Sequence, residues 1–76
     1  MDVRIGISES NQIIEVDMDD DTDRDGLKKR VADAIGAESM LWVSDKKGKE
    51  IGVPGGRIAF VDIGTAETDR RIGFGA

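Results

Sequence analysis

The chain lacks cysteine, histidine and tyrosine, and these absences exclude several kinds of site. Without cysteine there is no disulfide framework and no thiolate cage for a metal ion. An enzyme needs a nucleophile, an acid or base and a group that stabilises charge in the transition state, and the missing side chains often fill these roles. We therefore expect a protein that is not an enzyme and that holds no cofactor and no metal.

Long apolar runs are also missing. From Met1 the sequence leads directly into an alternating segment, and no stretch is apolar for long enough to be a signal peptide or to span a membrane. The absence of cysteine means that nothing in the chain requires an oxidising compartment. These features predict a cytoplasmic protein with no membrane partner.

Aromatic residues make up only 4% of the 76 residues, so the core must be largely aliphatic. A chain of this length forms one domain, near the size at which folding buries only about 60% of the surface of the unfolded chain. The net charge of −5 argues against general binding to nucleic acids, because lysine and arginine supply most of the affinity for phosphates.

The spacing of apolar residues predicts a small α+β fold. Val3, Ile5 and Ile7 alternate with polar residues or glycine, as in a strand with one buried face, whereas Leu27 and Val31 recur at helical spacing. We expect a single domain over residues 1–76 with the order ββαβββ, in which one helix packs on one face of a mostly antiparallel sheet. The expected strands are residues 2–8, 12–18, 40–44, 49–53 and 57–64, the expected helix is 23–35, and 65–76 form a C-terminal tail.

Local signals predict how these elements begin, end and turn. Thr22 and Asp25 have the spacing of a capping box at the helix start, and Gly36 is suited to the left-handed position that ends a helix. Gly48 suits the bulge position after a type I turn. Pro54 followed by Gly55 is typical of a type II turn.

Three segments resemble a known family. Residues 3–7 read VRIGI, residues 53–64 read VPGGRIAFVDIG and residues 70–76 read RRIGFGA. In these segments the chain is similar to a small group of actinobacterial proteins, domain-of-unknown-function family 3107. The resemblance implies the ββαβββ fold but no activity and no catalytic residue. Members are sometimes described as nucleotide-binding, and the chain contains no phosphate loop that supports this description.

Two of the expected strands, 40–44 and 57–64, are apolar at both odd and even positions, and 40–44 is therefore expected in the interior of the sheet. A helix of this length is about 20 Å long and about 10 Å wide, whereas five strands span about 24 Å. The helix is too small to cover both faces. The face opposite the helix then presents an apolar patch, which we expect to contain Met40, Trp42, Ile58 and Phe60.

This patch needs a cover, and two covers fit the sequence. Ile72 and Phe74 of the tail can fold back across it, or the patch can bind a second copy or another protein, with Arg71 at the rim. We therefore predict a non-catalytic protein-interaction module, either a homodimer or an adaptor in a larger bacterial assembly. Its predicted binding residues are Met40, Trp42, Ile58, Phe60, Arg71, Ile72 and Phe74.

The alternative prediction is a nucleic-acid, nucleotide or anion binder. Lys46, Lys47 and Lys49 form a basic hairpin tip, and the glycine-rich turn at 52–57 adds backbone amides and Arg57. A calcium loop is suggested by the acidic segment at 21–26. It fails at the twelfth position, where an alanine replaces the glutamate that such loops require.

Overall fold

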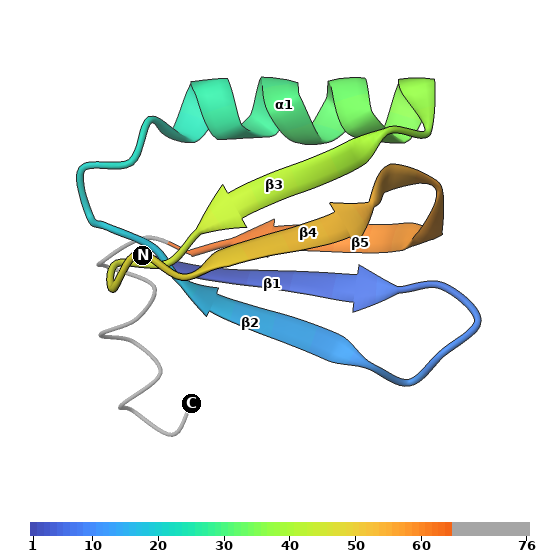
Figure 1. Cartoon of the computed structure of the whole chain (residues 1–76), viewed down its shortest axis with the longest axis horizontal. Coiled ribbons are helices and arrows are strands. Elements are labelled where there is room, and N and C mark those ends of the chain that lie inside the picture. Colours follow the sequence, from blue (N-terminus) through green and yellow to red (C-terminus); the bar gives the residue numbers. More distant parts are fainter. Residues whose placement is uncertain (65–76) are drawn as a thin grey trace.

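The computed structural model describes residues 1–64, and these residues form the predicted α+β fold with the order ββαβββ (Figure 1). Two strands precede one helix, and three strands follow it. A single turn of 3-10 helix, η1, connects the last two strands. The elements are β1 (Asp2–Ile7), β2 (Ile13–Asp17), α1 (Arg24–Ala37), β3 (Met40–Ser44), β4 (Glu50–Pro54), η1 (Gly55–Arg57) and β5 (Ile58–Ile63).

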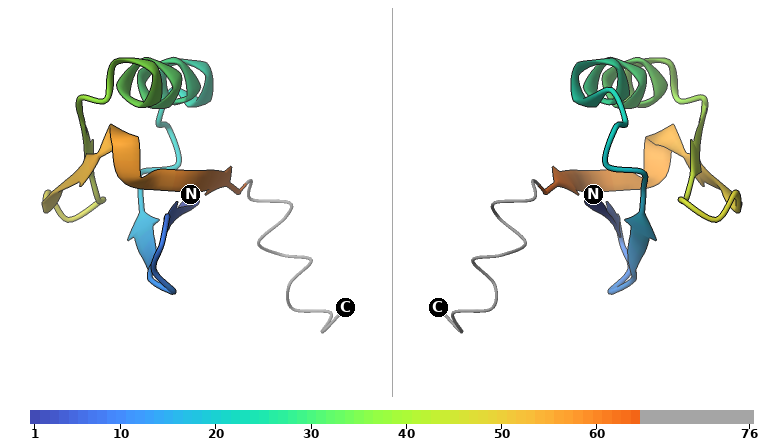
Figure 2. Two further views of the ribbon diagram at one scale, coloured as in Figure 1. Left: turned by 90° about the vertical axis from the view of Figure 1, so that its right-hand side faces the viewer. Right: turned by 90° about the vertical axis from the view of Figure 1, so that its left-hand side faces the viewer.

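The strands form two sheets, and not the single five-stranded sheet that we expected. One sheet has the order β2-β1-β5, and the other consists of β3 and β4. All three strand pairs are antiparallel. Helix α1 lies next to β3, and the β1–β2 hairpin lies farthest from it (Figure 1). In the end-on views of Figure 2, β5 lies between α1 and that hairpin.

A continuous aliphatic core joins the two sheets to the helix. Val3 and Ile5 of β1 are buried because alternate side chains of a strand point to the same face. Leu27, Val31 and Ala34 are buried on α1 because their three- and four-residue spacing places them on one side of the helix. Strand β3 shows the same alternation, with Leu41 and Val43 buried and Met40 and Trp42 exposed. Because β3 pairs only with β4 among the described strands, the prediction that it is an interior strand is wrong.

Both predicted helix ends are also wrong. Asp23, and not Thr22, is the N-cap residue, and its side chain makes no capping hydrogen bond, so the expected capping box is not formed. At the other end the helix continues through Gly36, and Glu38 takes the left-handed conformation with φ 54°. The amide of Ser39 donates to the Ala34 carbonyl at 3.0 Å, which closes the end of the helix as a Schellman motif.

The two glycine turns differ in outcome. Gly48 has φ 91° and its amide donates to the Asp45 carbonyl at 3.0 Å, which confirms the predicted hairpin turn. A type II turn requires a positive φ at Gly55. Gly48 is the only glycine of residues 1–64 with positive φ, and Gly55 instead begins the 3-10 turn η1, so the predicted type II turn is wrong. Gly55 is needed for space: an added Cβ would lie 2.1 Å from the carbonyl oxygen of Ala34.

A bulge in β5 separates two residues that we expected on one face. Ile7 of β1 pairs with Ile58, and the preceding residue, Gly6, pairs with Phe60, so Ala59 is the additional residue. Because cross-strand partners share a face, Ile58 lies on the core face with Ile7 and Phe60 lies on the outer face with Gly6. Ile58 accordingly packs against the core, while 44% of Phe60 is exposed.

Candidate functional site

An apolar row crosses the outer face of the three-stranded sheet. Ile13 and Phe60 are the partners of Gly6 on its two sides, so the three residues form one line across β2, β1 and β5. Ile13 is 53% exposed and Phe60 is 44% exposed. The Phe60 ring lies directly over Gly6, where an added Cβ would be 2.1 Å from the ring. The glycine therefore provides the space in which the aromatic ring rests on the backbone.

The same arrangement occurs on the second sheet. Trp42 of β3 pairs with Gly52 of β4, and an added Cβ at Gly52 would lie 2.8 Å from the indole ring. The indole is 54% exposed, and Met40 is 49% exposed on the same face of β3. Arg30 of α1 donates a hydrogen bond to the Trp42 carbonyl, which ties this strand to the helix.

The structure divides the predicted apolar patch between the two sheets. Met40 and Trp42 lie on β3, Phe60 lies on β5, and Ile58 belongs to the core face. The predicted contributions of Arg71, Ile72 and Phe74 fall outside the described residues. Ile13 was not predicted. The pair of consecutive isoleucines at 13 and 14 was the available signal, because adjacent strand residues point to opposite faces.

The basic residues of the alternative prediction do not form one site. Lys46 pairs with Asp17 at 3.0 Å, and Lys47 and Lys49 are exposed in the β3–β4 turn. Arg57 lies in η1, at the opposite end of β4 from that turn (Figure 1). The amide of Gly55 donates to the Ser39 carbonyl at 2.7 Å, so it is already used within the fold.

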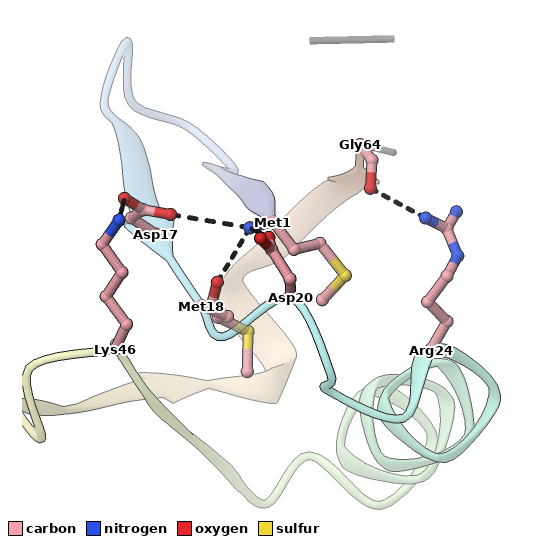
Figure 3. A network of polar contacts seen from close by, with 7 residues as sticks. All are labelled: Met1, Asp17, Met18, Asp20, Arg24, Lys46 and Gly64. Carbon is pink, nitrogen blue, oxygen red and sulfur yellow. Dashed lines mark hydrogen bonds and ion pairs between the residues drawn. The ribbon is translucent and has the colours of Figure 1, made fainter. Parts of the chain in front are cut away.

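An acidic cluster surrounds the α-amino group of Met1 (Figure 3). This amine donates to the Met18 carbonyl and to Oδ1 of Asp20, both at 2.8 Å, and lies 3.6 Å from Oδ1 of Asp17. Asp17 also accepts from Lys46. The cluster joins the chain start to β2 and to the β3–β4 turn. Among residues 1–64, no group of three or more metal-ligating side chains is close enough together to hold a metal ion.

These contacts shift the ionisation of the groups in the cluster. The hydrogen bond from the Met1 amine lowers the pKa of Asp20, and the same bond raises the pKa of the amine. The hydrogen bond from Lys46 lowers the pKa of Asp17 and raises that of the lysine. Because its pKa is lower in the folded chain, the Asp20 carboxylate stabilises the fold at pH values above 3.8, its usual pKa. This stabilisation is lost as the pH falls through the lowered pKa. Because its pKa is higher in the folded chain, the Met1 amine stabilises the fold at pH values below 8.0, its usual pKa. This stabilisation is lost as the pH rises through the raised pKa of the folded chain.

We therefore expect Asp20→Asn to destabilise the chain only in a window of pH. The urea midpoint of the variant should be lower than that of the wild type at pH 6, and the difference should shrink below about pH 3.8 and again well above about pH 8. Urea unfolding followed by circular dichroism across pH 3 to 10 measures this. The matched control is Asp19→Asn. A difference between Asp20→Asn and wild type that stays constant over the whole range would contradict the assignment.

Residues 1–75 match the model of a protein family whose description is "Protein of unknown function (DUF3107)". The chain belongs to this family. The match covers every described element, and it confirms the predicted resemblance to this family. No curated protein matches the chain. The α1 helix of this DUF3107 member is not of the length and apolar character needed to cross a membrane, and it is the one α-helix within residues 1–64.

Proposed function

We propose that the chain is a non-catalytic, cytoplasmic protein-interaction module that binds its partner through exposed aromatic side chains. The observation that supports this is the placement of Trp42 and Phe60 over cross-strand glycines. Aromatic residues are the commonest energetic centres of protein interfaces. A ring that already rests on the backbone loses little conformational freedom when a partner covers it, so more of its burial energy is available for binding.

The charges next to the aromatic row indicate what the partner surface contains. The row of Ile13, Gly6 and Phe60 is followed on the same face by Glu15, Arg4 and Asp62, which are also cross-strand partners. The next positions along β1 and β2 are Asp2 and Asp17. A partner that fits this face has an apolar centre bordered mainly by basic residues, since complementary charge favours association.

The experiment is affinity purification of the tagged chain from its own cells, repeated with Trp42→Ala and with Phe60→Ala. We expect loss of a specific partner in at least one variant, with affinity for the purified partner falling about 30-fold, as for an interface hot spot. Sedimentation equilibrium of the same proteins tests self-association. Gly6→Ala and Gly52→Ala provide a second test, because each displaces a ring without removing it.

Lys47→Ala is the matched control, since Lys47 is an exposed residue of the β3–β4 turn and is not aromatic. A partner that is retained by both aromatic variants would contradict the proposal. The alternative function, binding of nucleic acid or an anion at the lysine turn, predicts the reverse pattern. RNA binding would then weaken with added salt and with each of Lys47 and Lys49 removed, while Trp42→Ala would leave it unchanged.

A further inference from the structure

An apolar groove lies between α1 and β5, and neither Trp42 nor Phe60 lines it. It has a volume of about 330 Å³. Val31, Ala32 and Ile35 of α1 form one wall, and Val61 and Ile63 of β5 form the other. Ile35 is 42% exposed, although the preceding turn of the same helix packs into the core. The helix and the strand thus enclose apolar space that neither fills.

The strand that forms this groove has a free edge. β5 pairs with β1 on one side, and no other strand of residues 1–64 pairs with it. At one end of the edge the Arg24 guanidinium donates to the carbonyl of Gly64 at 2.7 Å (Figure 3). The same guanidinium donates to the carbonyl of Ile63 at 3.3 Å. The Ile63 carbonyl therefore points away from β1. Backbone groups of a strand alternate with a period of two, so the amide and carbonyl of Val61 point to the same free edge.

The rim of the groove is basic in a chain of net charge −5. Arg24 and Lys28 both border it, and their four-residue spacing places them on one side of the helix. The groove face of β5, formed by Val61 and Ile63, is uncharged. An occupant with a carboxylate would complement the two cations, whereas the walls require apolar side chains.

We infer that the groove binds an extended peptide of a partner protein, which adds as a strand to the free edge of β5. Its alternate side chains are apolar and lie beneath α1, and an acidic side chain or terminal carboxylate lies beside Arg24 and Lys28. This mode supplies affinity through main-chain hydrogen bonds and specificity through every second side chain. The inference goes beyond the proposed function, because it concerns a separate surface and does not depend on Trp42 or Phe60.

A second copy of the chain fits the groove less well. Two β5 strands paired at their free edges would bring Val61 and Ile63 from both copies to the groove face, with Asp62 on the outer face. That arrangement supplies apolar surface but no carboxylate for Arg24 and Lys28. Charge complementarity therefore favours an acidic peptide of another protein.

The test begins with a phage-displayed library of random twelve-residue peptides, selected on the full chain. We expect enriched peptides that have apolar residues at alternate positions and an acidic group at one end. A synthetic copy of the best peptide is then added to the ¹⁵N-labelled chain. The largest amide shifts should occur at Val61, Ile63 and Ile35.

Two sets of changes separate strand addition from other modes. N-methylation of the peptide at successive positions should weaken binding about tenfold or more at every second position and leave the others unaffected, because only alternate amides face β5. Lys28→Glu should weaken binding about tenfold, while Lys29→Glu, the same charge change one residue along, should not. Trp42→Ala should leave peptide binding unchanged.

Several outcomes of these experiments would overturn the inference. They are the absence of enriched peptides, amide shifts centred on Trp42 or Phe60, N-methylation effects without a two-residue period, and equal effects of Lys28→Glu and Lys29→Glu. A further experiment uses the full chain with Ile72→Asp and Phe74→Asp. If these changes raise the affinity for the peptide, the chain's own residues 65–76 compete for the groove, and the assignment to a partner protein is wrong.

Discussion

Gly55→Ala is expected to lower the free energy of unfolding by about 3 kcal/mol, at the upper end of the cost of overpacking a core. The added Cβ would lie 2.1 Å from the carbonyl oxygen of Ala34 and 2.6 Å from that of Ser39. Both atoms belong to the backbone at the end of α1, so no side-chain rotation relieves the contact. The 2.7 Å hydrogen bond from the Gly55 amide to Ser39 would be strained as well.

The neighbouring glycine is the control for this substitution. A Cβ at Gly56 would have Cγ of Glu38 as its nearest neighbour, at 3.6 Å, which is an ordinary contact with a flexible side chain. Gly56→Ala should therefore change the free energy of unfolding by no more than about 0.5 kcal/mol. Urea unfolding followed by far-ultraviolet circular dichroism measures both variants. Similar midpoints for Gly55→Ala and wild type would show that η1 does not pack against the helix end as described.

Leu27→Ala is expected to cost about 3 kcal/mol, because Leu27 is 1% exposed and its truncation leaves a cavity between α1 and the sheets. A domain of this size has a total stability of roughly 4 to 11 kcal/mol. The substitution therefore removes a large fraction of the stability and should lower the urea midpoint strongly, with little change in the slope of the transition.

Ile35→Ala, on the same helix, should have a much smaller effect on stability. Ile35 is 42% exposed at the groove, so its truncation removes less buried surface than that of Leu27 and should cost about 1 kcal/mol. The two variants together separate residues that hold the helix to the core from residues that form the open wall. Equal destabilisation by Leu27→Ala and Ile35→Ala would mean that the groove is closed in solution.

The strands and the helix followed from the spacing of apolar residues. Val3 and Ile5 are buried as the two-residue period predicts, and Leu27 and Val31 are buried as the helical period predicts. Local turn chemistry was sufficient to predict the β3–β4 hairpin, because the turn requires a positive φ and Gly48, as a glycine, adopts it without a steric cost. These features depend on neighbours in sequence, and that is why the sequence predicted them.

The predictions that failed depend on contacts between distant residues. Gly36 was expected to end the helix, but the helix continues to Ala37 and its last turn packs against η1. An added Cβ at Gly36 would have nothing within 4 Å, so Gly36 occupies an open helical position that does not require glycine. The bulge at Ala59, which moves Ile58 to the core face, has no signature in the local sequence.

The sequence by itself determined the order of the elements, the aliphatic core and the family. It also singled out Trp42 and Phe60 as two of the few aromatic residues of the chain. Only the tertiary structure decided that the strands divide into two sheets, that the rings of Trp42 and Phe60 lie over glycines of neighbouring strands, and that within residues 1–64 β5 pairs on one side only, beside α1. The physical reason is that periodicity specifies which face of an element is buried, whereas pairing, register and bulges are set by packing between segments far apart in the chain.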